Sequence, residues 1–116
     1  MRWSLFGVTA LGAAYYLLMG YINPIVAGWP MTVDSAAEEA LSWLSAEQKS
    51  EFRAKSKDQL YEYHFGLGMA IRNRFGLWND NWPLLQSACD TRCHPDDASG
   101  VILERMWQKL QAPPSP

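Results

Sequence analysis

The sequence predicts an all-α protein, in which an N-terminal transmembrane or signal helix precedes a small domain of four to five short helices. Three observations predict this fold class. First, no Asp, Glu, Lys, Arg or His occurs between Trp3 and Val33, and a charge-free stretch of this length is typical of a membrane segment. Second, β-branched residues are sparse beyond Pro30 and no apolar–polar alternation occurs there, which disfavours strands. Third, helix start and stop signals recur in the same region.

Length and charge narrow the class of protein. The chain has 116 residues, which allows one small domain with a modest core. Arg2 is the only charged residue before Asp34, so nine of the ten basic residues and all twelve acidic residues lie in the remainder. Nucleic-acid-binding domains normally carry a basic excess. We therefore expect no nucleic-acid partner.

Residues 1–30 are predicted to form a membrane anchor or a signal segment. The stretch 3–22 has about 20 uncharged residues, enough to span a bilayer core, and Arg2 marks the cytoplasmic side. The membrane is thus an expected partner through residues 3–22, with the domain tethered to the inner membrane and lying outside the cytoplasm. Cleavage after Gly28 is the alternative and predicts a secreted or periplasmic domain. A helix buried in a cytosolic core is the third.

The domain, residues 31–111, is predicted to begin with two short helices. The capping box Ser35-x-x-Glu38 opens the first, and Ser45-x-x-Gln48 opens the second. Apolar residues of the first helix share one face, and they are Ala37, Ala40, Leu41 and Leu44.

The third predicted helix is the longest. It opens at Ser56-x-x-Gln59 and ends before Trp78, with Gly76 at a position that favours a left-handed cap. Several side chains recur on it at helical spacing, and they are Leu60, His64, Leu67, Ile71 and Phe75.

Two further helices complete the predicted domain. One covers residues 82–88. The last opens at His94-Pro95-Asp96-Asp97, where proline occupies the first turn and two carboxylates lie near the positive end of the helix dipole. It runs to about Leu110 and buries Ala98, Ile102, Met106 and Leu110. Residues 112–116 are predicted to form a disordered Pro-rich tail.

Two sequence blocks in this domain resemble a known family. They are HFGLGxxIRNxxGLW, from His64 to Trp78, and HPDDxS, from His94 to Ser99. Together they resemble a bacterial family with a domain of unknown function, over about residues 34–110. The resemblance implies a small helical domain that is often exported, and it carries no activity. Cys89 and Cys93 lie between the blocks and depart from the family pattern.

The two blocks supply the candidate site. His64, Gly68 and Arg72 are spaced at i, i+4 and i+8, which on one helix places an imidazole and a guanidinium on either side of a glycine gap. That gap is expected to admit a ligand or, alternatively, the last helix. We expect Arg72 to pair with Asp96 or Asp97, because a partly buried guanidinium needs a carboxylate. An acid/base site in which Asp96 and Asp97 exchange protons with His64 and His94 is the catalytic alternative.

Two more residues complete the candidate set. Asn73 is expected to brace the turn after its helix, or to contact a ligand, through its side-chain amide. His94 is expected to cap the last helix or to pack its ring under the turn. The candidate binding residues are therefore His64, Gly68, Arg72, Asn73, His94, Asp96 and Asp97. No catalytic residue is assigned.

Cys89 and Cys93 leave several interpretations open. A local disulfide is favoured, because the pair is alone in the chain and exported thiols meet an oxidising environment. Zinc bound with His64 and His94 is an alternative, and so is a haem attachment site, which would need one residue fewer between the cysteines. Free thiols are the last. We predict the disulfide, with no metal and no cofactor.

The function that these observations favour is an exported or membrane-anchored binding module of the cell envelope, with an envelope protein as partner. One alternative is a small enzyme that uses a cluster of His64, Arg72 and either Asp96 or Asp97. Another is an immunity-like inhibitor protein. An open cleft with unpaired polar atoms would favour an enzyme, and mutual salt bridges closed under the tryptophans would favour a scaffold.

Overall fold

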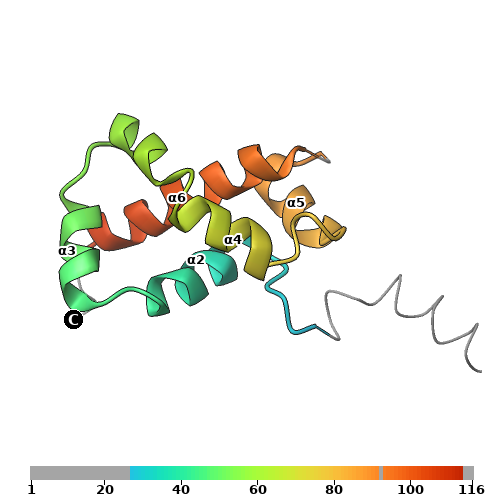
Figure 1. Ribbon diagram of the computed structural model, residues 1–116, viewed down its shortest axis with the longest axis horizontal. Coiled ribbons are helices and arrows are strands. Elements are labelled where there is room, and N and C mark those ends of the chain that lie inside the picture. The colour runs from blue at the N-terminus through green and yellow to red at the C-terminus, as the bar shows by residue number, and fades with distance from the viewer. Residues whose placement is uncertain (1–26, 92, 114–116) are drawn as a thin grey trace, which may run out of the picture.

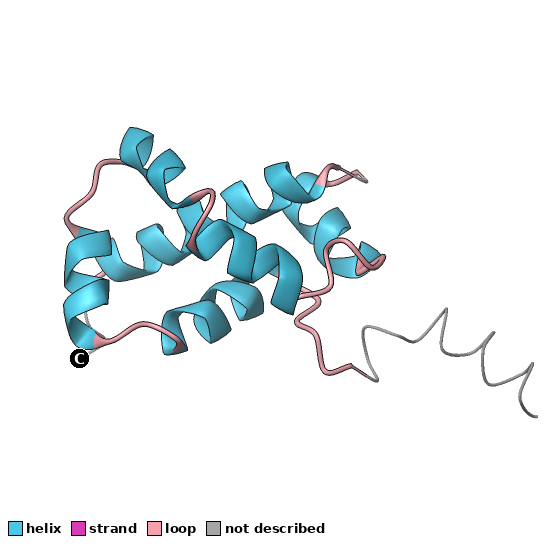
Figure 2. Cartoon of the chain, viewed as in Figure 1, coloured by secondary structure: helices cyan, strands magenta, loops and turns pink. Residues whose placement is uncertain are grey.

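The computed structural model describes residues 27–91 and 93–113. Within these ranges the protein is all-helical, with no strand, which confirms the predicted class (Figure 2). The helices are α2 (Val33–Ser42), α3 (Ala46–Arg53), the 3-10 helix η1 (Lys57–Tyr63), α4 (Leu67–Arg74), α5 (Trp82–Cys89) and α6 (Pro95–Gln111). No helix in the described ranges is long and apolar enough to cross a membrane. The span predicted over residues 3–22 lies outside them.

Helix α6 is the central element of the domain. It packs against α2, α3, η1, α4 and α5 (Figure 1). Its own buried face includes Ala98, Ile102 and Met106, as its spacing predicts, whereas Leu110 is only partly buried. The core around it is apolar, and it is formed by Ala36, Ala37, Ala40, Phe52, Leu60, Ile71, Phe75, Leu77, Leu84, Leu85, Ala98, Ile102, Leu103 and Met106.

The start of α2 differs from the prediction. The helix is capped by Thr32, whose hydroxyl accepts a hydrogen bond from the Ser35 amide at 3.1 Å, so Ser35 lies inside the helix rather than at its cap. Threonine caps a helix nearly as well as serine, and Thr32 lies three residues before Ser35. At α3 the prediction is confirmed, because Ser45 and Gln48 make both hydrogen bonds of the capping box.

The third predicted helix is broken in two, and among the described residues α6 is the longest helix instead. Gln59 accepts a hydrogen bond from the Ser56 amide as expected, but the turn that follows is the 3-10 helix η1. The chain then leaves helical geometry at Gly66, where φ is −99° and ψ is −91°, before α4 begins. Glycine is a weak helix former, and two glycines close together make a break inexpensive. The break leaves the His64 carbonyl free to accept a hydrogen bond from elsewhere.

The end of α4 has the predicted left-handed cap. Gly76 has φ of +66°, and the Leu77 amide donates to the Arg72 carbonyl at 3.1 Å, which is the longer hydrogen bond of a Schellman motif. The ring of Trp29 lies directly on Gly76, because a Cβ placed there would come within 2.5 Å of it. The buried Asn81 amide also donates to the Pro30 carbonyl at 3.0 Å. Trp29 and Pro30, which the sequence assigns to the N-terminal segment, therefore contact the helical domain.

Candidate functional site

The side chain of Arg72 joins the two sequence blocks. It is only 4% exposed. Its Nη1 donates to Ser99 Oγ at 2.8 Å and its Nη2 to the His64 carbonyl at 2.9 Å. The expected carboxylate partner is Asp96, with Nε 3.5 Å from Oδ1. The guanidinium is therefore held by His64 of the first sequence block and by Asp96 and Ser99 of the second. It points into the protein rather than toward a ligand.

The glycine gap next to Arg72 is filled by this chain. A Cβ placed on Gly68 would lie 3.1 Å from Arg72 Nη1, 3.2 Å from the Tyr63 carbonyl and 3.6 Å from Leu103 Cδ1. The gap was expected to admit either a ligand or the last helix, and in the structure the last helix, α6, approaches it. Gly68 is required because the guanidinium folds back over it.

His64 does not share a helix with Gly68 and Arg72, so the predicted stripe on one helix is wrong. The break before α4 separates them, and His64 reaches Arg72 only through its backbone carbonyl. The His64 imidazole instead stacks on the ring of Tyr61, with centroids 5.6 Å apart and planes 11° from parallel, and meets Phe65 edge-on at 4.8 Å. Its side chain is thus part of an exposed aromatic group.

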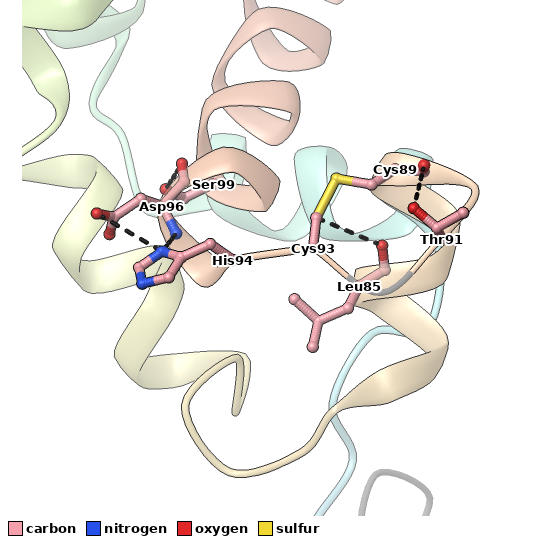
Figure 3. The surroundings of a disulfide bond; sticks show 7 residues. All are labelled: Leu85, Cys89, Thr91, Cys93, His94, Asp96 and Ser99. Atoms are coloured by element: carbon pink, nitrogen blue, oxygen red, sulfur yellow. Dashed lines mark hydrogen bonds and ion pairs between the residues drawn. A yellow bond between two sulfur atoms is a disulfide. The ribbon is translucent and has the colours of Figure 1, made fainter.

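His94 caps α6, as expected (Figure 3). Its Nδ1 accepts a hydrogen bond from the Asp96 amide at 3.1 Å. The same nitrogen lies 3.7 Å from Oδ2 of the Asp96 carboxylate. The exposed imidazole also lies edge-on to Trp78, with centroids 5.4 Å apart. Its role here is structural.

The two remaining candidates face solvent. Asp97 is exposed, and no residue in the described ranges forms a hydrogen bond or ion pair with its carboxylate. The side chain of Asn73 is exposed at the end of α4 and likewise has no hydrogen-bond partner in the part of the chain that the structure describes. The turn after α4 is braced by Asn81 instead, whose amide donates to the Phe75 carbonyl at 2.7 Å.

Cys89 and Cys93 form a disulfide, with Cα atoms 6.0 Å apart (Figure 3). The geometry is accessible because α5 ends at Cys89 and Asp90 takes a left-handed conformation, with φ of +60°. Both thiols are therefore used by each other, which leaves no thiolate for the zinc or haem alternatives. Across the described ranges no three His, Cys, Asp or Glu side chains are placed to hold a metal ion.

An open groove of about 740 Å³ lies between η1 and α6. Leu60, Val101 and Leu103 supply its apolar lining, and predicted residues His64, Asp96 and Asp97 also line it. We call it the η1–α6 groove. It brings the imidazole and both carboxylates of the predicted cluster to one surface, while the guanidinium of that cluster stays buried.

Sequence reasoning missed residues that this groove depends on. Gly100 and Tyr61 both line it. Gly100 had a signal, because glycine inside a long helix is unfavourable and calls for a reason. Tyr61 had none, because its position depends on the 3-10 geometry of η1. Ser99, the closest partner of Arg72, belongs to the HPDDxS block and shows why that block ends in serine.

The pKa shifts lie outside the η1–α6 groove. A hydrogen bond to Glu62 of η1, and the charge of that carboxylate, raise the pKa of Lys55. The other shifts lie between α2 and α6. Two hydrogen bonds hold the pKa of Asp34 below its ordinary 3.8. The one from Lys109 has the larger effect, and the one from Arg105 has the second largest. The same contact with Asp34 raises the pKa of Lys109. The atoms meet at 2.9 Å in both ion pairs. These charges fasten two helices together and do not prepare a group for proton transfer.

Comparison with known proteins finds a family for this chain. The sequence model of a family described as Domain of unknown function (DUF6794) matches residues 29–110. The match begins at Trp29, whose ring packs on Gly76, and ends within α6. No curated protein and no solved structure matches the chain.

Proposed function

This chain belongs to the DUF6794 family, and from that premise we propose that it is an interaction module of the cell envelope that binds a basic segment of a partner protein in the η1–α6 groove. Residues 3–22 anchor it in the membrane, and residues 29–111 lie outside the cytoplasm. The observation that carries the proposal is Gly100, which holds the groove open at a cost to its own helix.

Gly100 has no intramolecular reason to be glycine. It lies inside α6, its φ is not positive, and a Cβ placed on it would meet nothing within 4 Å. Glycine in a helix interior costs about 1 kcal/mol relative to alanine. A partner that lies against the backbone of α6 at this point supplies the missing reason, because a side chain there would keep it away.

The groove has a lining that suits a cationic partner. Its carboxylates include Asp58, Asp97 and Glu104, while Lys57 is already paired with Glu104 at 3.1 Å. Tyr61, 74% exposed, offers an aromatic face beside them. An arginine or lysine side chain can place its aliphatic stem on the apolar lining and its charge near a carboxylate and a ring.

The closed state of Arg72 favours binding over catalysis. A small enzyme built on the His64, Arg72 and Asp96 cluster needs a guanidinium that can reach a substrate. Here the guanidinium is buried and its donors already have partners.

The test uses the full chain in phosphatidylcholine nanodiscs and a fluorescent peptide in which arginine alternates with leucine. We expect this peptide to bind and a counterpart with glutamate in place of arginine not to bind. Gly100→Ala should raise the melting temperature while weakening binding, and Gly100→Leu should abolish binding. Gln108→Leu adds the same side chain to an exposed position of α6 outside the groove, and it should bind like the wild type.

If Gly100→Ala raises the melting temperature and weakens binding, the glycine serves the binding groove and not the stability of the fold. Equal affinity of the arginine peptide for the wild type and Gly100→Leu would overturn the proposal, and so would equal affinity for the two peptides. Membrane topology has its own test. A C-terminal reporter that is active only in the cytoplasm would contradict an exported domain.

A further inference from the structure

Three large apolar side chains are exposed where the chain enters the domain. They are Met31, Trp78 and Trp82, with exposed fractions of 43%, 52% and 51%. Trp78 lies in the turn between α4 and α5, and Trp82 begins α5 directly after Asn81, whose amide donates to the Pro30 carbonyl. Met31 follows that carbonyl directly. We call these three side chains the indole patch.

Hydrogen bonds hold the patch at one end of the molecule. Beyond Met31, the Val33 amide donates to Ser87 Oγ of α5 at 2.9 Å, so the entering segment is fixed to the α5 region on both sides of Met31. Figure 1 shows the entering segment at the end of the domain that carries α5. The patch shares no residue with the η1–α6 groove.

The core does not need these two indoles, although it uses others. Trp43 packs on Phe75 with ring centroids 5.1 Å apart, and Trp107 donates to the Lys55 carbonyl at 2.8 Å. Both are partly buried. Trp78 and Trp82 instead leave about half of their surface exposed. Half-exposed indoles leave apolar ring surface in water, and neighbouring apolar side chains exposed in this way mark an interaction site.

The length of chain outside the described residues indicates what that partner is. The predicted span ends at Ile22 and Trp29 is fixed on Gly76, so residues 23–28 form the only connection. Six residues span at most roughly 20 Å. This end of the domain is therefore held close to the bilayer, and tethering makes even a weak contact populated. Indoles are favoured at the membrane–water interface, where the ring is buried and its N–H meets the headgroups.

We propose that the indole patch lies in the headgroup layer of the bilayer and orients the domain on the membrane surface. The inference rests on the anchor of the proposed function. It adds a second binding surface, whose ligand is the phospholipid interface, and it leaves the η1–α6 groove free for a protein partner.

The experiment is fluorine NMR on the full chain with its six tryptophans replaced by fluorotryptophan. The chain is placed in phosphatidylcholine nanodiscs at one copy each, so that a second copy cannot cover the patch. Single Trp→Phe variants assign each resonance. A lipid with a spin label on its headgroup should broaden the resonances of Trp78 and Trp82, and leave those of Trp43 and Trp107 sharp.

Trp3 distinguishes failure of this inference from failure of the anchor. Broadening of Trp3 without broadening of Trp78 and Trp82 would overturn the patch and leave the anchor standing. Absence of broadening at all three would remove the anchor and the patch together.

A matched pair of variants tests the contact itself. Trp78→Ser with Trp82→Ser should abolish broadening at the backbone amides of Leu77 and Asn79. Phe65→Ser with Met69→Ser removes two other exposed apolar side chains, neither of which lines the η1–α6 groove, and should leave that broadening unchanged. Equal broadening in both double variants would overturn the proposal.

Discussion

Replacing Arg72 by alanine removes the side chain that joins the His64 and His94 blocks. The two best contacts of the guanidinium are with neutral acceptors, Ser99 Oγ at 2.8 Å and the His64 carbonyl at 2.9 Å. The charge partner is weaker, because Asp96 is 3.5 Å away and its side chain is 44% exposed. The structure thus assigns most of the stabilisation to the buried hydrogen bonds and little to the ion pair.

The magnitudes follow from these contacts. A hydrogen bond to a charged group contributes about 1.5–3 kcal/mol, so losing two should cost Arg72→Ala about 3–6 kcal/mol of unfolding free energy. Asp96→Ala removes a half-exposed ion pair of about 0–1 kcal/mol and a carboxylate at the helix N-terminus of about 0.3–1 kcal/mol. Ser99→Ala leaves a buried donor without a partner, which costs about 1–3 kcal/mol.

Urea denaturation followed by circular dichroism measures these differences. Arg72→Ala removes a large part of the stability that a small domain has, about 5–15 kcal/mol, so Ser99→Ala and Asp96→Ala serve as variants that remain folded. Arg72→Lys keeps the charge and loses the fork geometry, and it should recover little. In double-mutant cycles with Arg72→Lys, coupling to Ser99 should exceed coupling to Asp96. The opposite order would refute this account of the cluster.

Three further predictions concern other parts of the fold. Gly76→Ala should lower the free energy of unfolding by more than the strain of a left-handed alanine, which is about 1–2 kcal/mol, because the added Cβ collides with the Trp29 ring. In a Trp29→Ala background the loss should fall to the value of that strain. Equal losses in thermal melts of both backgrounds would contradict the packing of Trp29 on Gly76. The contacts with Lys109 and Arg105 lower the pKa of Asp34 in the folded state, so the stability that Asp34 contributes is complete above pH 3.8 and is lost as the pH falls through the lower folded pKa. Asp34→Asn should therefore flatten the acid side of a plot of urea midpoint against pH. Identical profiles for the variant and the wild type would count against this account. Cys89→Ser with Cys93→Ser opens a short loop and should cost about 2 kcal/mol in urea denaturation, whereas labelling of both thiols in unreduced native protein would exclude the bond.

Local signals in the sequence predict much of the fold, and contacts between distant segments decide the rest. The Ser45 box and the left-handed Gly76 are local and are confirmed. The break at Gly66 was missed because the spacing of apolar side chains continues across it. What maintains the break is a distant contact, the hydrogen bond from Arg72 to the His64 carbonyl, which a continuous helix would have used internally.

The candidate site divides along the same line. Pairing of Arg72 with a carboxylate follows from the cost of burying a charge, which sequence reasoning can include. The η1–α6 groove could not be predicted, because it exists only where η1 passes over α6. Gly100 was the one residue in the sequence that indicated it, through a cost that nothing nearby explained.

The central position of α6 has a consequence for the order in which the chain is synthesised. Every other helix in the described ranges packs against α6, and α6 is the last of them to be translated. The earlier helices have between 7 and 10 residues each, too short to be stable alone in water. A nascent chain that ends before Pro95 therefore lacks the helix against which all the others pack, and it has only smaller contacts, such as those between α2 and α5 and between Trp43 and Phe75, on which to bury apolar surface. The core of the domain is completed only after residues 95–111 emerge.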